Sequence, residues 1–393
     1  MIPHVSRHLR LTLALPLFIV VSFLPAFAAP QGQTPAPAAD SILSAPEPSD
    51  VSSNWKNLVG VYGKEKARSI TITEREGKLF LIAPFLYAGD NSYFPIRQIG
   101  NSSFSFPNPS GPPIQAVTVA DGSGHITQLM ITPDFHGPPD TTPNAPKSYR
   151  IVEPWYFPRA DAGSDSAHFY HITPAQPVAE LREKALKLSP PEEPGPYRKP
   201  DLVELARLDP AIHLDIRYAS AKNFLSTPVY TQARAFMQGP AAGALVRVLH
   251  KLQPLGYGLL IHDAYRPWYV TKIFWDATPP EGKIFVADPQ KGSKHNRGCA
   301  VDLTLYDLAT GQPVEMPGLY DEMSPRSFPN FPGGTSLQRW HRDLLRRAME
   351  SEGFTVNEDE WWHFDYKNWK QYGILNVSFE KIAVGQQSSA ISH

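Results

Sequence analysis

The stretch SKHNRGCAVDLTLYD, residues 293–307, decides the fold of the second half of this chain. In AVDLTLY, aliphatic residues occupy every second position, which is the period of a β-strand with one face in a core. Asp302 is therefore expected on the opposite face, lining a cleft or facing solvent. His295 precedes this strand in a segment that Gly298 can bend sharply, so that the imidazole can return to the carboxylate.

A second motif, DEWWHFDY at residues 359–366, supplies the rest of a candidate site. Glu360 and His363 are three positions apart, a spacing that suits one helical face or a kinked strand whose side chains share a cavity. Taken singly, an Asp on a strand or a His beside tryptophans is more often structural. With His295 and Asp302, however, the motif gives two imidazoles, one carboxylate and a fourth position for water, which is the arrangement of a catalytic zinc site.

Helices and strands are both indicated around these motifs. GPAAGALVRVLHKLQPLGYG predicts a helix that begins near Pro240 and ends near Gly256. GLLIHDAYRP predicts a buried strand that ends at a polar turn, which leaves Arg266 at a strand-to-helix corner. TSLQRWHRDLLRRAMESEGF predicts a helix that ends before Gly353. We expect an α+β fold over residues 201–382, with a mainly antiparallel sheet and flanking helices.

The N-terminal segment has the pattern of an export signal. Residues 1–29 combine a basic start, an apolar run and small residues, which predicts a signal peptide cleaved near Ala28. An uncleaved anchor is the alternative, but the apolar run is shorter than the ~20 residues that span a bilayer. We expect a periplasmic or secreted protein with no membrane span after cleavage. Residues 30–53, rich in Ala, Pro and Ser, are expected to form a disordered linker.

Short alternating strands dominate residues 54–158. SITITERE is followed by Gly77 and then by KLFLIAP, and AVTVADGSGHITQLMI contains two alternating runs joined by a turn, which predicts a hairpin. We expect a small all-β domain, which resembles the lipocalin-like β-domains of some secreted bacterial hydrolases. It is either an interaction module for an envelope partner or a structural cover. Residues 159–200 are expected to form a helix and proline-rich connector, and residues 383–393 a disordered tail.

The charge balance and cysteine content exclude some classes of protein. The chain of 393 residues has 37 basic and 38 acidic residues, so no electrostatic signature favours binding to nucleic acid or to an anionic membrane surface. Cys299 is the one cysteine, which rules out a disulfide within the chain.

Four motifs together resemble a known family. SKHNRGCAVDLTLYDLATG, DEWWHF, GYGLLIHDAYRP and DIRYASAKNF are similar to motifs of the D-alanyl-D-alanine dipeptidases, zinc enzymes that cleave the free dipeptide D-Ala-D-Ala and include those of the glycopeptide-resistance type. The resemblance covers about residues 200–375, and the motifs occur in the family's order. NFLSTPVY departs from the family's NFTG, and MPGLYDEMS matches its Met-Gly and Phe-Asp pattern only in part, so substrate scope is less defined than the metal site.

The resemblance implies a function for individual residues. It implies one zinc ion per chain, Glu360 as the catalytic base and Arg266 as the group that polarises the scissile carbonyl. The implied metal ligands are His295, Asp302 and His363, and the residues expected at the substrate are Tyr218, Ser293 and Trp361.

Three functional hypotheses follow. The first is a zinc dipeptidase that hydrolyses D-Ala-D-Ala, a small dipeptide from cell-wall metabolism. The second is a related zinc D,D-carboxypeptidase or L,D-endopeptidase that trims peptidoglycan stem peptides. The third is a cell-envelope binding protein with a catalytically silent zinc fold, which the intact Glu360 and Arg266 disfavour.

Overall fold

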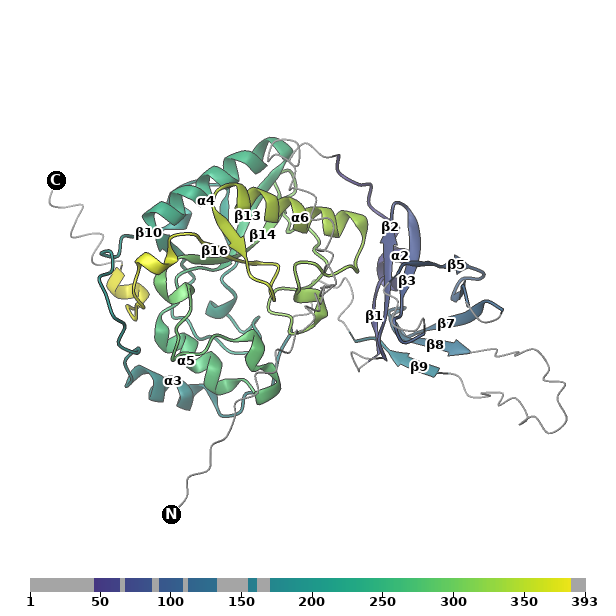
Figure 1. Cartoon of the computed structure of the whole chain (residues 1–393), viewed down its shortest axis with the longest axis horizontal. Helices are drawn as coiled ribbons and strands as arrows, with labels where there is room; N and C mark the ends of the chain where they lie inside the picture. Colours follow the sequence, from purple (N-terminus) through teal and green to yellow (C-terminus); the bar gives the residue numbers. More distant parts are fainter. Residues whose placement is uncertain are drawn as a thin grey trace, which may run out of the picture. The chain divides into compact units, whose positions relative to one another are not determined.

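A computed structural model describes residues 46–63, 68–86, 92–108, 112–132, 155–160 and 170–382 (Figure 1). The expected signal peptide, most of the expected linker and the expected C-terminal tail lie outside these ranges. In the ranges given, no helix combines the length and apolar character that crossing a bilayer requires.

The N-terminal strands form two antiparallel sheets, preceded by the short helix α2 (Ser53–Leu58). The first sheet contains β1 (Gly60–Tyr62), β2 (Ile70–Arg75), β3 (Lys78–Ile82) and β4 (Phe94–Pro95), in that order. The second contains β5 (Arg97–Gln98), β6 (Ser103–Phe106), β7 (Ile114–Ala120), β8 (Ile126–Thr132) and β9 (Trp155–Pro158), again in chain order.

The hairpin expected in this part of the chain is present, and a second hairpin precedes it. The strands β2 and β3 pair across Gly77, whose φ of 73° is the left-handed conformation that glycine adopts without strain. The strands β7 and β8 pair across a turn in which the Asp121 carboxylate accepts hydrogen bonds from the backbone N–H groups of Ser123 and His125. His125 is exposed, in line with a loop histidine. Side chains from both sheets meet in one hydrophobic cluster.

The second half of the chain is built on a five-stranded sheet. Its strands, in spatial order, are β11 (Ile212–Leu214), β13 (Tyr257–Asp263), β14 (Ala300–Asp307), β16 (His363–Tyr366) and β15 (Phe354–Val356). Only β11 and β13 run parallel, so the sheet is mainly antiparallel, as expected. A separate antiparallel pair joins β10 (Leu202–Glu204) to β12 (Phe236–Gln238).

Four helices pack around this sheet: α3 (Val178–Leu186), α4 (Gly239–Leu252), α5 (Trp268–Ala277) and α6 (Ser336–Ser351). Short 3₁₀ helices are η2 (Leu205–Arg207), η3 (Arg217–Ala219), η4 (Gln253–Leu255), η5 (Pro280–Phe285), η6 (His295–Arg297), η7 (Pro325–Ser327) and η8 (Trp369–Gln371). Figure 1 shows α4 and α6 on one side of the central strands and α3 with α5 on the other.

The helix boundaries follow the sequence signals. Pro240 lies in the first turn of α4, and the chain leaves the helical segment at Gly256 with a φ of 89°. Thr335 caps α6 in a capping box: its side chain accepts from the Gln338 N–H, and the Gln338 side chain accepts from the Thr335 N–H. Gly353 follows α6 with a φ of 86°.

The hydrophobic core of this half begins before residue 201. Leu181 and Ala185 of α3 belong to the same cluster as the sheet and helices that follow. In the connector, the Glu193 carboxylate forms an ion pair with Arg297 and accepts a hydrogen bond from the Ile374 N–H. The connector therefore binds directly to the loop that carries His295.

Candidate metal centre and active site

Strand register places three site residues in one row across the sheet. Asp302 on β14 lies opposite Asp263 on β13 and opposite His363 on β16. The pairing of β13 with β14 shifts around His262, next to this row, as in a β-bulge, which is a common feature beside active sites. Because the three strands are hydrogen-bonded neighbours, the row is fixed by the backbone of the sheet.

His295 reaches this row from η6, just before β14. Gly298 ends η6 with a φ of 68°, and a Cβ atom there would lie 2.6 Å from a Leu202 methyl carbon. Glycine is thus required for both conformation and space, as the sequence suggested. The His295 carbonyl also accepts a hydrogen bond from the Arg266 N–H, which ties this loop to the end of β13.

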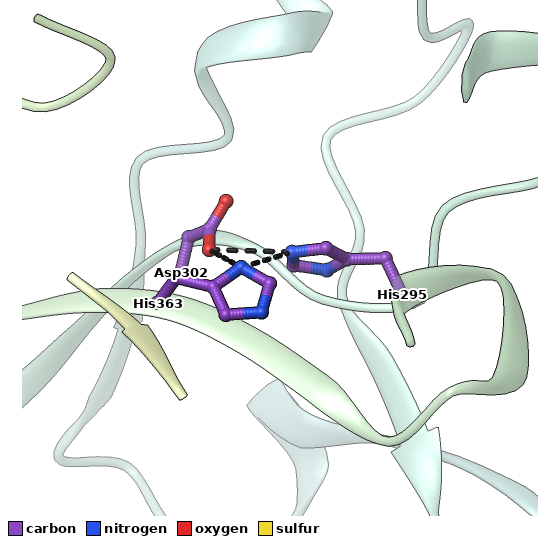
Figure 2. Close-up of side chains that lie close together, drawn as sticks. All are labelled: His295, Asp302 and His363. Atoms are coloured by element: carbon purple, nitrogen blue, oxygen red, sulfur yellow. Dashed lines mark hydrogen bonds and ion pairs between the residues drawn. The ribbon is translucent and has the colours of Figure 1, made fainter. Parts of the chain in front are cut away.

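Three side-chain atoms converge at the centre of the site (Figure 2). The His295 Nε2 lies 3.3 Å from the Asp302 Oδ1 and 3.1 Å from the His363 Nδ1, and the His363 Nδ1 lies 3.1 Å from the same Oδ1. All three residues are buried.

The hydrogen bonds of the two rings show which nitrogen carries a lone pair. The His295 Nδ1 lies 2.6 Å from the Ala264 carbonyl oxygen, which can only accept, so this nitrogen donates. The His363 Nε2 lies 2.9 Å from the Asp365 carboxylate and donates to it. In the neutral rings the facing Nε2 and Nδ1 are therefore acceptors, and with a carboxylate oxygen they form a cluster that attracts a cation.

The cluster fits a zinc ion. Among the described residues, Asp302 Oδ1 is a buried atom with no hydrogen-bond partner. Zinc at ~2.0–2.1 Å from tetrahedral ligands puts them about 3.3 Å apart, close to the distances found between these atoms. Burial alone would lower the pKa of His363, but Asp365 and Asp302 outweigh it and raise the pKa to about 10, so a metal ion bound here would displace a proton from this ring. Burial opposes ionisation of Asp302, yet His295 and His363 hold its pKa well below the ordinary value.

Glu360 lies next to this cluster, but on a different element from the one expected. The sequence suggested one helical face or a kinked strand, whereas Glu360 lies in the turn between β15 and β16, and His363 is the first residue of β16. The turn carries the Glu360 Oε2 to 3.5 Å from the His363 Nδ1, and the same oxygen accepts a hydrogen bond from Asn357. Burial raises the pKa of Glu360 to about 7, and a divalent cation beside it would oppose this rise.

Arg266 occupies the strand-to-helix corner that the sequence predicted, between β13 and α5. Its Nε donates to the Asp263 Oδ2 at 2.8 Å, and its Nη2 lies 3.7 Å from the Asp302 Oδ2. Asp263 in turn accepts a hydrogen bond from the Tyr230 hydroxyl at 2.6 Å. The guanidinium is thus buried, paired and held above the ring of Phe274.

These groups line one cavity of about 210 Å³. Tyr218 and Ser293 are part of its wall, as predicted, and the Ser293 Oγ accepts a hydrogen bond from the His295 N–H. Trp361 is not part of the wall; the adjacent Trp362 is. Trp361, which was expected at the substrate, is instead a buried core residue.

Two groups in the cavity region were not predicted as site residues. Asp321 lines the cavity and accepts a hydrogen bond from the Tyr218 hydroxyl at 3.0 Å, while its Oδ2 is buried and has no partner among the described residues. Burial, together with the charges of Asp302 and Glu360, raises the pKa of Asp321 well above the ordinary value. Tyr320, its neighbour, contacts Asp302. The partial family match of MPGLYDEMS was the available signal for both residues.

Cys299 follows the metal loop but has no features of a reactive thiol. It is fully buried, and burial raises the pKa of its thiol to about 12. A thiol of this kind stays protonated at neutral pH and is a poor nucleophile.

Comparisons with known proteins agree with this site. The profile of the family described as D-ala-D-ala dipeptidase matches residues 198–382. The D-alanyl-D-alanine dipeptidase of Escherichia coli K12 is 35% identical over 179 residues, which are 46% of this chain and 91% of that protein. The Enterococcus faecalis dipeptidase is 35% identical over 181 residues, 40% of this chain and 88% of that protein. The Streptomyces coelicolor dipeptidase is 32% identical over 185 residues, 42% of this chain and 92% of that protein. This chain therefore belongs to the D-alanyl-D-alanine dipeptidase family of zinc-dependent hydrolases.

Proposed function

We propose that this chain is a zinc dipeptidase that hydrolyses D-alanyl-D-alanine to two molecules of D-alanine. The observation that carries the proposal is the convergence of three ligand atoms, with Glu360 and Arg266, on one small cavity. The ligand atoms come from His295, Asp302 and His363. The similarity to proteins named D-alanyl-D-alanine dipeptidase supports the choice of substrate.

Glu360 is assigned as the general base and acid. His295, Asp302 and His363 would hold the zinc ion, which would supply a bound water with a pKa lowered toward ~7 and polarise the substrate carbonyl. Glu360 takes a proton from the attacking water as the new C–O bond forms. The same carboxyl returns that proton to the amide nitrogen as the C–N bond breaks, so the amine leaves neutral. Its position suits this role, because its Oε2 lies 3.5 Å from the His363 Nδ1, and a water on a metal held by His363 would be within its reach.

Arg266 is assigned to the oxyanion. Its guanidinium stays charged at every accessible pH, and Asp263 holds its Nε side, which leaves other N–H groups of the guanidinium for the substrate. A donor fixed in a buried cavity stabilises the charge that develops on the carbonyl oxygen without reorganisation during the reaction.

Asp321 and Tyr218 are assigned to the substrate ammonium group. A buried carboxyl with one free oxygen and no cationic hydrogen-bond partner has a site for a positive charge. A free dipeptide carries an ammonium group at its N-terminus. When the same two residues end a longer peptide, that nitrogen is part of an amide bond and has no charge. Ser293, at the cavity wall, is assigned to the same substrate through its hydroxyl.

The same features favour a dipeptidase over a D,D-carboxypeptidase or an L,D-endopeptidase. The cavity of about 210 Å³ is below the ~300–1,000 Å³ of typical sites for larger ligands. Stem peptides are longer than two residues and have an acylated nitrogen at the position where Asp321 would bind an ammonium group. We therefore expect the short, free dipeptide to be preferred.

The first experiment is release of D-alanine by the purified chain from D-Ala-D-Ala, N-acetyl-D-Ala-D-Ala and isolated muropeptides. Each is measured as purified, after treatment with a chelator, and after zinc is restored. Zinc-dependent cleavage of the free dipeptide alone supports the proposal. Cleavage of muropeptides but not of the dipeptide would favour the stem-peptide enzymes, and a zinc-loaded protein without any turnover would favour an envelope binding protein.

We further propose that the chain is exported to the periplasm or secreted, and that residues 54–158 form a lipocalin-like β-domain for an envelope partner. The N-terminal export pattern and the two antiparallel sheets with their own hydrophobic cluster support this. Cell fractionation with N-terminal sequencing tests the first part: a cytoplasmic protein that keeps residues 1–29 would contradict it.

A further inference from the structure

The carboxylate of Asp302 has two oxygens with different neighbours. Oδ1 faces the Nε2 of His295 and the Nδ1 of His363, at the centre of the metal cluster. Oδ2 accepts a hydrogen bond of 3.0 Å from the hydroxyl of Tyr320. The mechanism assigned above makes no use of this hydroxyl.

The hydroxyl of Tyr320 is the nearest donor to that second oxygen among the described residues. The Arg266 Nη2 is also near this oxygen, but at 3.7 Å it is too far for a good hydrogen bond. Arg266 is already bonded to Asp263 through its Nε. The hydroxyl of Tyr320 therefore provides the hydrogen bond to the second oxygen of Asp302.

The ring of Tyr320 is itself held by packing. It stacks on His262, with ring centres 4.5 Å apart and an angle of 30° between the planes, and it meets the Trp362 ring edge-on at 5.5 Å. The His262 ring lies 3.3 Å from the carbonyl oxygen of Asp215, on the backbone just beyond β11. The hydroxyl consequently has a fixed position relative to the sheet that carries Asp302.

We propose that Tyr320 is a positioning residue for the metal ligand Asp302: its hydroxyl holds Oδ2, so that the carboxylate offers Oδ1 alone to the metal. This inference rests on the proposed zinc site. Without the hydroxyl, Oδ2 is free to turn toward the guanidinium of Arg266 or toward the metal. Either movement alters the ligand geometry, and the first also draws the guanidinium away from the substrate. Hydrogen bonds to ligands from outside the metal's own shell commonly change metal affinity by about 10–100-fold when removed.

Tyr320→Phe removes the hydroxyl and keeps the ring that stacks on His262. We expect its zinc dissociation constant, measured on the full chain by competition with a chromophoric chelator, to rise by about 10-fold or more. The visible absorption bands of the cobalt-substituted protein report coordination directly, and we expect them to shift. In kinetic assays at saturating zinc, kcat should fall more than KM rises, because Asp321 and Tyr218, the groups assigned to the substrate ammonium, are unchanged.

Tyr265→Phe is the matched control, since it removes a buried tyrosine hydroxyl that donates to the Val377 carbonyl oxygen and lies outside the site. It should leave zinc affinity and the cobalt spectrum unchanged. A Tyr320→Phe protein with wild-type zinc affinity and cobalt spectrum would overturn the inference, as would an equal loss in both variants. A folded wild-type protein that binds no zinc would instead refute the proposed function on which the inference rests.

Discussion

Replacing Asp321 by asparagine should weaken catalysis and strengthen the fold at the same time. The two side chains have nearly the same shape, and the amide oxygen introduced by Asp321→Asn can still accept the hydrogen bond from Tyr218. Asp321 has a φ of 58°, a left-handed conformation that Asn and Asp tolerate better than other non-glycine residues. The substitution thus changes the charge with little change to the backbone, which Asp321→Ala would not do.

The loss of activity can be bounded from the proposed contact. Removing one partner of a buried, hydrogen-bonded charge pair costs about 2–5 kcal/mol, and tenfold in rate corresponds to about 1.4 kcal/mol. We expect kcat/KM for D-Ala-D-Ala to fall by roughly 30-fold to several thousand-fold. N-Acetyl-D-Ala-D-Ala has no ammonium group, so the variant should cleave it no worse than the wild type does, and the preference for the free dipeptide should shrink.

The gain in stability follows from the pKa of the buried carboxyl. The pKa of Asp321 is higher in the folded protein than in the unfolded chain, where it is ~3.9. At any pH above ~3.9 this difference lowers the free energy of unfolding, and the loss grows with pH until the folded pKa is passed. Asparagine has no such penalty. Burial is the largest cause of the shift and does not depend on what the neighbouring ligands bind. Each kcal/mol recovered raises Tm by about 2–4 °C in a domain of 150–250 residues.

Steady-state kinetics on both substrates and thermal unfolding of the zinc-loaded protein at pH 7 test this pair of effects. Asp276→Asn, on α5 and paired with Lys272, is the control for loss of one negative charge elsewhere. Wild-type kcat/KM for the free dipeptide in the Asp321→Asn protein would refute the role in ammonium binding. A lower Tm would refute the argument that burial of this carboxyl, which raises its pKa, destabilises the fold at pH 7.

Other predictions concern the base, its pH dependence and the buried thiol. Glu360→Gln should keep zinc, by metal analysis, and lose about 10²–10⁴-fold in kcat; substantial activity would remove Glu360 from the mechanism. Because only the ionised Glu360 accepts a proton, kcat/KM should decline as the pH falls, with a midpoint at or below about 7, the pKa before any effect of zinc; a rate unchanged down to pH 4 would contradict this. Cys299 should not react with a thiol reagent in the native protein and should react once unfolded, so rapid native labelling would show that its burial is wrong.

The three residues that converge in the candidate metal cluster could be picked out from the sequence because two of them lie on strands and the third just before one. Two-residue alternation in AVDLTLY placed Asp302 opposite the aliphatic core, and Gly298 marked the bend that returns His295. Helix caps at Thr335 and Gly353 were readable for the same reason: each follows from the local chain alone. Such patterns can be interpreted without knowing which segments, far away in the sequence, pack against them.

The residues that were misplaced or missed lie in segments where the local sequence pattern does not predict which way a side chain points. Trp361 and Trp362 are adjacent in a turn just before β16, and no local pattern indicates that Trp361 lies in the core while Trp362 lines the cavity. Tyr320 and Asp321 lie in the irregular segment between β14 and α6, which has no periodicity. Their contacts with Asp302 and Tyr218 join positions 18 and 103 residues apart.

The difference between residues on strands and residues in loops has a functional consequence. Asp302 and His363 are fixed by strand register, so a change in surrounding loops leaves their relative positions intact. The groups proposed to bind the dipeptide, by contrast, come from a 3₁₀ turn and from loops, which can vary while the sheet remains the same. Related chains should therefore retain the metal chemistry while differing in the peptides that they accept. For this chain, Asp321 is the residue proposed to bind the ammonium group, so the proposed preference for a free dipeptide rests on that carboxyl more than on the candidate metal ligands.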